Sequence, residues 1–386
     1  MTVSDIDILI RGGHVIDPAR KIDRIADIAI KGNRIVDAKT EEPTRTGQVI
    51  DAAGCYVLPG LIDFHSHFFY GGSAISIDPD ITFLPSGITT AVDAGTCGWS
   101  NVDIFQRSII DRSRMRLFYY LNVSHAGQVT LGGDSGYPEK INGRHINGPE
   151  IIACCEKYRP SLIGLKLRFG KELYGEDDSP LRDTLRLAEQ VGLAVCVHVP
   201  NCLITMDTLA GFLRPGDVFA HCYHDTGHTI LDGDGNVLPD IFSAQRRGVY
   251  FDAAQGINLF SFRVARQAFA QHFYPDIISS DITRYSAWKP GIMFSLNFLM
   301  SKYIAMGMPL QEVVRAVTAT PAGIIGQADK IGTLRNGACA DVCIMKMKKQ
   351  ATTFFDKDGE LLAGDGLLQN MLTICDGQVV FRQMDF

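Results

Sequence analysis

The sequence lacks the long apolar runs that mark proteins of the membrane or of the secretory route. No stretch approaches the ~18 consecutive apolar residues that a membrane-spanning helix needs. The N-terminus, MTVSDIDILIRGG, has acidic residues where a signal peptide would have a basic start followed by an apolar run. We therefore expect a cytoplasmic protein that does not associate with a membrane.

The chain also lacks a cluster of basic residues. It contains 37 Lys and Arg against 43 Asp and Glu, which gives a formal net charge of -6. Surfaces that bind nucleic acid are usually basic patches or stripes, so this balance argues against a nucleic-acid partner. A small-molecule substrate is the expected partner, and association into a homo-oligomer is left open.

Neither CxxC pairs nor the spacing of a disulfide framework is found among the ten cysteines. Most of them have apolar neighbours, as Cys196 has in Val195 and Val197. We expect them to be reduced, small core residues. A thiolate metal ligand at Cys196 or Cys222, both close to histidines discussed below, is a less favoured alternative because neighbouring residues of a strand face opposite sides.

The two ends of the chain have the pattern of short antiparallel strands. Residues 7–57 combine alternating apolar residues with Gly-Gly and Gly-Asn turn pairs, and residues 340–381 repeat this pattern. Chain ends of a domain often lie close together. We therefore predict that residues 1–56 and 335–386 form one small β-sandwich domain and that residues 57–334 form a second domain.

The middle of the chain alternates short apolar runs with amphipathic helical stretches, such as Pro180–Gln190 and Pro309–Thr318. Such alternation predicts βα units around a parallel sheet. The length suits a barrel of roughly 250 residues with one smaller module. We predict an α/β fold, a (β/α)8 TIM barrel, with an open doubly wound sheet as the alternative. The eight apolar runs are Val57–His67, Gly87–Gly95, Leu117–Ser124, Leu162–Arg168, Leu193–His198, Asp217–His221, Gly248–Ala253 and Asp276–Asp281.

Two histidines end the first apolar run. His65 and His67 are two residues apart, so both side chains lie on one face of a strand. At the C-terminal end of a barrel strand, that face points into the mouth, where the active sites of this fold lie. Two imidazoles that converge there can bind a divalent ion, although this short pattern is weak by itself.

Three later runs end in a residue of the same kind, namely His198, His221 and Asp281. Each alone has a structural explanation, as a hydrogen-bonded core histidine or as a helix N-cap. The C-terminal ends of all barrel strands meet at one mouth. Taken together, the four histidines and the aspartate indicate a metal site.

Lys166 lies inside the apolar run Leu162–Arg168. Burying an uncompensated ammonium group is unfavourable, and neighbouring dications would favour the neutral amine. A neutral amine can take up carbon dioxide, and the resulting carbamate has two oxygens suited to bridging two metal ions. The alternative is a lysine that reaches the rim of the barrel and pairs with Glu176 or Asp177.

The order of these residues, HxH, lysine, two histidines and an aspartate, resembles the binuclear-metal branch of the amidohydrolase superfamily, which carries a carboxylated lysine. The lead-in Leu58-Pro59-Gly60-Leu61-Ile62-Asp63 and the segments 319–323, 330–334 and 337–342 are also similar to that superfamily. The resemblance covers nearly the whole chain. Its nearest group is that of the dihydroorotase-like amidohydrolases and deacetylases.

The resemblance implies that six residues hold two divalent ions: His65, His67, Lys166, His198, His221 and Asp281. The HxH pair and the aspartate would hold the first ion, the two later histidines the second, and a lysine carbamate formed from CO2 would bridge them. Zn2+ is the expected metal, with Mn2+ or Fe2+ as alternatives. A metal-bridging hydroxide would attack the scissile carbonyl, and Asp281 would be the catalytic residue that moves the proton.

Residues at two positions narrow the range of reactions that the resemblance allows. Asn201 stands where mononuclear deaminases carry a glutamate, three residues after the histidine of strand five, and Phe69 stands where dihydroorotases typically carry an arginine. We expect a deacetylase-like amidohydrolase that cleaves a non-peptide amide or a carboxylic ester, for example in an N-acyl amino acid or an O-acetyl 2-hydroxy acid. Candidate contacts to the substrate are His125, Arg168, Arg284 and Lys289.

Two other enzymatic functions are alternatives, a cyclic amidohydrolase of the dihydroorotase or hydantoinase type and an adenine deaminase-like C–N hydrolase. A non-catalytic scaffold is disfavoured, because relatives of that kind have lost metal ligands. This chain retains all six.

Overall fold

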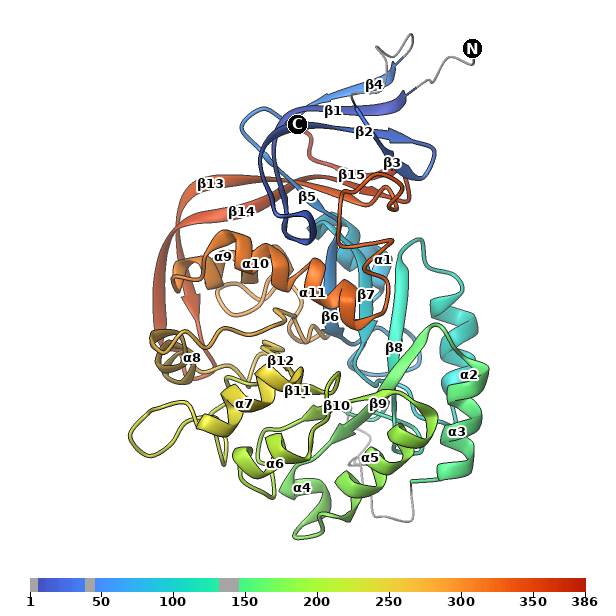
Figure 1. The fold of residues 1–386 in the computed structure, drawn as a ribbon, viewed down its shortest axis with the longest axis vertical. Coiled ribbons are helices and arrows are strands. Elements are labelled where there is room, and N and C mark those ends of the chain that lie inside the picture. Colours follow the sequence, from blue (N-terminus) through green and yellow to red (C-terminus); the bar gives the residue numbers. More distant parts are fainter. Residues whose placement is uncertain (1–5, 39–45, 132–145) are drawn as a thin grey trace.

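The computed structural model describes residues 6–38, 46–131 and 146–386. An α/β barrel forms most of it, and a separate sheet built from both ends of the chain lies at one end of the barrel (Figure 1). Residues 1–5, which belong to the N-terminal segment considered above, lie outside the described residues. No helix in the described part of the chain is long and apolar enough to cross a bilayer.

The sheet from the chain ends, here called the terminal sheet, is mostly antiparallel. In the described residues its strands pair in the order β15-β14-β13-β5-β1-β2-β3, with β4 beside β1. Apolar side chains from both chain ends, among them Ile10, Val57 and Leu372, form one buried cluster on it. The domain limits predicted above stay a prediction. The strands are β1 (Ile6–Asp17), β2 (Ile22–Lys31), β3 (Arg34–Val36), β4 (Thr46–Asp51), β5 (Tyr56–Pro59), β13 (Val342–Phe355), β14 (Leu361–Cys375) and β15 (Gln378–Arg382).

The wall of the barrel is a parallel sheet, as predicted. Within the described ranges its seven strands pair in the order β12-β11-β10-β9-β8-β7-β6. These strands are buried almost throughout, which explains why they read as continuous apolar runs. They are β6 (Leu61–Ser66), β7 (Ile88–Asp93), β8 (Arg116–Asn122), β9 (Leu162–Arg168), β10 (Ala194–His198), β11 (Val218–Ala220) and β12 (Tyr250–Asp252).

The eighth predicted run closes the barrel without forming a regular strand. This closing segment, residues 276–282, bridges β12 at Ile277 and β6 at Ile282. The backbone of Asp281 has a φ of 50°, in the left-handed region, which is incompatible with regular strand pairing. The predicted run therefore occupies the eighth position of the barrel in an irregular conformation.

The first predicted run, Val57–His67, contains two strands rather than one. Its first residues belong to β5, which pairs with β1 and β13 of the terminal sheet, and only β6 belongs to the barrel. Gly60 separates them, and a Cβ atom at this position would lie 2.2 Å from Oγ1 of Thr89. The prediction of a single barrel strand is wrong because both strands are buried, so the apolar run continues across the boundary.

Helices cover the outside of the barrel, and α5 shows how the sequence specifies them. Leu181, Thr184 and Ala188 are buried at helical spacing, Pro180 lies in the first turn, and Gly192 ends the helix with a φ of 63°. The two helices expected above are α5 and α10. The helices are α1 (Pro79–Phe83), α2 (Val102–Phe105), α3 (Gly148–Lys157), α4 (Lys171–Tyr174), α5 (Ser179–Val191), α6 (Met206–Phe212), α7 (Pro239–Arg247), α8 (Phe262–Ala270), α9 (Leu296–Ala305), α10 (Leu310–Ala316) and α11 (Ala319–Ile324).

The barrel interior is packed with side chains. Phe64, Tyr120, Cys196 and Val218 come from four strands that are not all neighbours and form one buried cluster. All ten cysteines are free and buried, as the sequence predicts. The packed interior leaves the mouth at the C-terminal ends of the strands as the place for a site.

Candidate active site

The two histidines of the HxH motif lie at the C-terminal end of β6. The pairing of β6 with β7 shifts in register between Asp63 and Ser66, an irregularity typical of a β-bulge. His65 and His67 follow at this point, both almost fully buried. Nδ1 of His65 lies 3.0 Å from Oδ2 of Asp252, so this carboxylate orients the ring and leaves Nε2 facing the cavity.

His67 is oriented by a chain of two polar side chains. Its Nδ1 lies 2.7 Å from Oγ1 of Thr96, and this hydroxyl donates to Oδ2 of Asp93 at 2.8 Å. Because the threonine proton is used by Asp93, the hydroxyl oxygen accepts from Nδ1–H of His67. The other nitrogen, Nε2, is therefore the one that can accept a proton or hold a metal.

His221 and His198 stand beside each other at the ends of β11 and β10. Nδ1 of His221 lies 2.8 Å from the carbonyl oxygen of Ala254, so it donates there and presents Nε2 to the cavity. The ring centroid of His221 is 4.4 Å from that of His198 and 5.0 Å from that of His65. His221 adopts a φ of 70°, and a strained backbone at the mouth is often retained for function.

Asp281 meets the HxH pair from the closing segment. Its Oδ1 lies 3.0 Å from Nε2 of His67 and 3.8 Å from Nε2 of His65, and its backbone N–H donates to the carbonyl oxygen of His65. Burial alone would raise the pKa of Asp281, but the hydrogen bond with His67 and the neighbouring imidazoles hold this pKa well below its usual value. The carboxylate is thus ionised near neutral pH.

Lys166 lies at the floor of the same site. Its side chain is buried, and Nζ lies 3.4 Å from Nε2 of His65 and 3.4 Å from Sγ of Cys196. No carboxylate among the described residues forms an ion pair with it. The alternative of a pair with Glu176 or Asp177 at the rim does not hold, since both of these residues are exposed and Lys166 is not.

Burial lowers the pKa of His65, His198 and His221 well below the usual value for imidazole. These rings are therefore neutral, which is the form that binds metal ions. Burial also raises the pKa of the Cys196 thiol to about 11, so a thiolate ligand at this position is disfavoured.

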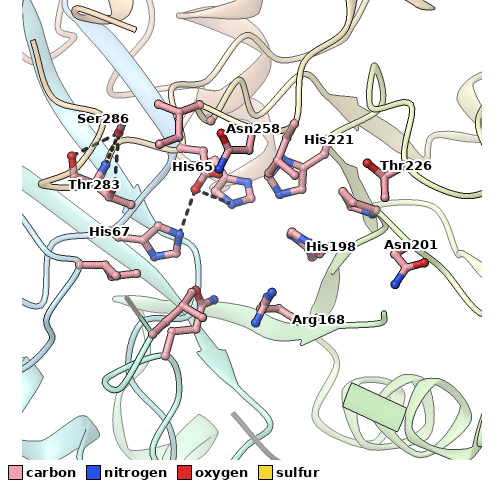
Figure 2. A pocket seen from close by; sticks show the side chains of 18 of the residues that line it. His65, His67, Arg168, His198, Asn201, His221, Thr226, Asn258, Thr283 and Ser286 are labelled. Atoms are coloured by element: carbon pink, nitrogen blue, oxygen red, sulfur yellow. Dashed lines mark hydrogen bonds and ion pairs between the residues drawn. The ribbon is translucent and has the colours of Figure 1, made fainter. Parts of the chain in front are cut away.

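All six predicted residues line one cavity of about 490 Å³, and Figure 2 shows the four histidines among them. Ligand atoms of His65, His221 and Asp281 all lie within 4.8 Å of one another, close enough to share one metal ion. This donor set of imidazole nitrogens and carboxylate oxygen is typical of zinc and similar divalent metals. Among the described residues, then, the site fits a metal, and the uncompensated Lys166 fits a second anionic ligand once it is carboxylated.

Of the four residues predicted to contact the substrate, one lines the cavity and three do not. Arg168, at the end of β9, lines the cavity, and Figure 2 shows it pointing toward the space between His67 and His198. Arg284 lines a separate hollow beside Trp288 and does not line this cavity.

His125 and Lys289 are likewise not among the residues that line the cavity. His125 packs edge-on against Trp99, with ring centroids 4.6 Å apart. Lys289 is exposed, and its side chain does not reach the site.

Several residues of the site were not predicted from the sequence. Asp93 and Asp252, which orient His67 and His65, lie near the ends of the predicted runs Gly87–Gly95 and Gly248–Ala253 and end strands β7 and β12. Carboxylates near the ends of apolar runs were therefore an available signal. Burial raises the pKa of Asp252 to about 6. The remaining polar lining comes from the short helix α4, which carries Glu172, and from loops, where no periodic pattern marks it: Gln128, Asn201, Thr226, Asn258, Thr283 and Ser286.

The chain is similar to curated enzymes over most of its length. A deacetylase of Agrobacterium fabrum is 31% identical over 344 residues, which make up 87% of this chain and 82% of that relative. A deacetylase of Enterococcus faecalis is 26% identical over 97% of this chain and 99% of its own. No protein-family model matches the chain.

Solved structures give the same result for the fold. The crystal structure of an adenine deaminase superposes with a TM-score of 0.88 at 25% sequence identity, covering 98% of this chain and all of the other. The crystal structure of a dihydroorotase superposes with a TM-score of 0.85 at 29% identity, covering 96% of this chain and 98% of the other. These similarities confirm the predicted TIM barrel.

Proposed function

The chain belongs to the amidohydrolase superfamily, in its dihydroorotase-like group, and we propose that it is a metal-dependent deacetylase of small acylated carboxylic acids. The single observation that carries this proposal is the cavity in which four histidines and Asp281 surround a buried lysine that has no acidic partner in the described part of the chain. Deacetylases are prominent among its similar relatives. The substrate is then an N-acyl amino acid or an O-acetyl 2-hydroxy acid.

The metal content we propose is two divalent ions, zinc first and Mn2+ or Fe2+ as alternatives. The HxH pair and Asp281 would hold one ion, His198 and His221 the other, and a carbamate formed on Lys166 from CO2 would bridge them. Bound ions would supply Lewis acidity for the acyl carbonyl and a lowered pKa for a coordinated water. The orientation of Nε2 of His65, His67 and His221 toward the cavity supports this arrangement.

Asp281 is the catalytic residue in this proposal. As a water oxygen adds to the acyl carbon, the carboxylate accepts the proton that the water loses. It then returns this proton to the leaving nitrogen or oxygen as the carbon–heteroatom bond breaks. The backbone N–H of Asp281, which donates to the carbonyl oxygen of His65, holds the carboxylate in place for both transfers.

Arg168 would bind the carboxylate of the substrate. Of the four candidate contacts, it alone lines the cavity, and a guanidinium group binds a carboxylate in a bidentate manner. Its ion pair with Glu172 is long, 4.0 Å, and Glu172 also accepts from Nδ2 of Asn201 at 2.8 Å. Glu172 would help to orient the guanidinium group.

The cyclic amidohydrolase and deaminase alternatives are kept because of the dihydroorotase and adenine deaminase structures. Phe69 argues against the first, since its buried ring packs on Phe105 and is not part of the cavity lining. Asn201 lines the cavity but is an amide and cannot serve as the acid that a deaminase places near this point. We also propose that the protein acts in the cytoplasm and without nucleic acid.

The test is a substrate screen with the protein loaded with Zn2+ or Mn2+. N-acyl amino acids, O-acetyl 2-hydroxy acids, cyclic amides and adenine are offered in parallel, and release of acetate, ring opening and release of ammonia are followed. Turnover of the first two classes is expected, with loss of activity on chelation and its return with the metal. Turnover of cyclic amides or of adenine alone would show that the deacetylase assignment is wrong.

A further inference from the structure

The turn between β13 and β14 reaches far from the terminal sheet. Both strands run along the side of the barrel beside α9, toward α8 (Figure 1). Side chains of α9 bond to β14, since Nδ2 of Asn297 donates to the carbonyl oxygen of Leu368 and Oγ of Ser301 accepts from its N–H. Residues 354–361, here called the hairpin tip, thereby arrive at the mouth of the barrel.

The hairpin tip first contacts the loop that follows β12. Oδ2 of Asp356 accepts from the N–H of Phe262 at 3.0 Å, and the N–H of Lys357 donates to the carbonyl oxygen of Phe260 at 3.2 Å. Residues 256–259 of this loop line the cavity. At Gly256 a Cβ atom would lie 2.9 Å from Oδ2 of Asp281, so the loop reaches the catalytic carboxylate itself.

A second contact joins the hairpin tip to the loop after β11. Nζ of Lys357 lies 3.0 Å from Oδ1 of Asp225, and both side chains are largely buried. Thr226, the next residue, lines the cavity and accepts from the N–H of Asn201 at its carbonyl oxygen. This ion pair therefore holds a loop that carries one cavity residue and supports another.

A third contact reaches the loop after the closing segment. The N–H of Phe355 donates to the carbonyl oxygen of Gly291 at 2.7 Å. A Cβ atom at Gly291 would lie 2.1 Å from the ring of Phe355, so only glycine permits this approach. The same loop begins with Thr283 and Ser286, which line the cavity.

The hairpin tip is itself rigidly built. Asp356 is 2% exposed, and its Oδ1 accepts from the N–H groups of Asp358 and Glu360 at 3.0 and 2.9 Å. Nζ of the buried Lys302 donates to the carbonyl oxygen of Phe355 at 2.8 Å. A rigid turn can transmit position to the loops that it contacts.

We propose that Asp356 and Lys357 are positioning residues for the reaction. The hairpin tip holds the loops after β11, after β12 and after the closing segment, and so fixes the part of the cavity wall that these loops form. The effect passes through residues 256–259, which stand between the tip and Asp281. The terminal sheet would then be part of the catalytic unit and not only a structural appendage.

The first experiment compares Asp356→Asn with Asp358→Asn. The second variant is a matched control, because Asp358 is exposed on the same turn and its carboxylate bonds only to Lys357 among the described residues. Hydrogen exchange is measured over residues 253–262, and KM and kcat are measured with an acyl substrate from the screen above. Asp356→Asn should speed exchange and raise KM about tenfold with kcat within about threefold of wild type, while the control stays at wild type.

If both variants behave alike, or if exchange rises while KM stays at the wild-type value, the positioning role is refuted. The kinetic part rests on the proposed function, but the exchange part does not. If the screen finds no substrate, the deacetylase proposal is wrong. If hydrogen exchange over residues 253–262 is unchanged in Asp356→Asn, the positioning proposal is wrong.

A second set of variants guards against misfolding of Asp356→Asn. Lys357→Met and Asp225→Asn should each raise KM, and the double variant should do no more than the stronger single variant, because both remove the same ion pair. Lys357→Arg keeps the positive charge that pairs with Asp225, so its KM should stay near the wild-type value. The proposal is contradicted if the increases in KM of the two single variants add up in the double variant, or if Lys357→Arg raises KM as Lys357→Met does.

Discussion

Two buried lysines, one at the floor of the cavity and one under the hairpin tip, have opposite surroundings. Lys302 donates to the carbonyl oxygen of Phe355, and Nζ lies 4.1 and 4.7 Å from the ring centroids of Phe260 and Phe262. Among the residues that the structure describes, Nζ of Lys166 has as partners a histidine nitrogen and a thiol, each at 3.4 Å. The difference teaches that the amine of Lys302 has a carbonyl acceptor and two phenyl faces within the fold, although burial lowers its pKa. Lys166 has neither kind of partner in the described part of the chain.

The largest effect is expected for Lys166→Met, with Lys302→Met as the matched substitution. Loss of the proposed carbamate ligand should reduce the bound metal to a fraction of the wild-type content and lower activity about a thousandfold or more. Lys302→Met should keep its metal, measured by elemental analysis of the purified proteins. If Lys166→Met keeps the wild-type metal content and turnover, Lys166 is not needed for metal binding, and the two lysines do not differ in this respect.

The next largest effect is expected for Asp281→Asn, which keeps the shape of the site around Lys166 but removes the proposed proton acceptor. Turnover should fall about a hundredfold to a thousandfold, while the thermal midpoint of unfolding changes little. Steady-state kinetics and calorimetry on the same preparation check both parts. A variant that retains most of its activity would mean that another group moves the proton.

Lys302 predicts a pH effect on stability. Burial lowers the pKa of Lys302 to about 7, against the attraction of Asp356, whereas an unfolded lysine keeps its ordinary value near 10.5. Between these two values the unfolded chain binds the extra proton, so stability rises with pH. The free energy of unfolding of wild type relative to Lys302→Met should grow by up to about 1.4 kcal/mol per pH unit from pH 7 to pH 10.

Urea unfolding of both proteins across this pH range measures the difference directly, since groups common to both cancel. A flat difference would show that Lys302 is charged in the fold. Lys302 would then be a buried cation, in contrast to the carbamate proposed for Lys166.

The smallest effect is expected for Arg168→Met, which removes the one arginine that lines the cavity among the described residues. KM for a substrate that carries a carboxylate should rise about tenfold to a hundredfold. A matched ester or amide without the carboxylate should react equally well with both proteins. An equal loss for both substrates would point to a structural role for Arg168.

The sequence was most informative where regular strands place chemistry at their ends. His65, His198 and His221 were found because apolar runs end in them, and the barrel brings such ends together. Lys166 was found because a lysine inside an apolar run conflicts with its surroundings. The structure places these predicted residues around one cavity, and their roles there await the experiments above.

What the sequence did not reveal depends on irregular backbone and distant contacts. The boundary at Gly60 is hidden because two buried strands read as one apolar run. Arg284 and Lys289 follow Asp281 closely, yet the loop turns them away from the cavity, and no periodicity predicts such a turn. Asp356 lies 75 positions beyond Asp281 in the sequence, so only the path of β13 and β14 brings it to the mouth.

The position of β13 and β14 in the chain has a consequence for biosynthesis. During translation every barrel strand leaves the ribosome before residues 354–361. The terminal sheet is also incomplete until β13 has been made, because β13 pairs with β5. Pairings between such distant segments form slowly. A newly made barrel therefore spends a period with its mouth loops unsupported, and a chain interrupted before residue 354 would carry every proposed metal ligand without the hairpin that supports the mouth.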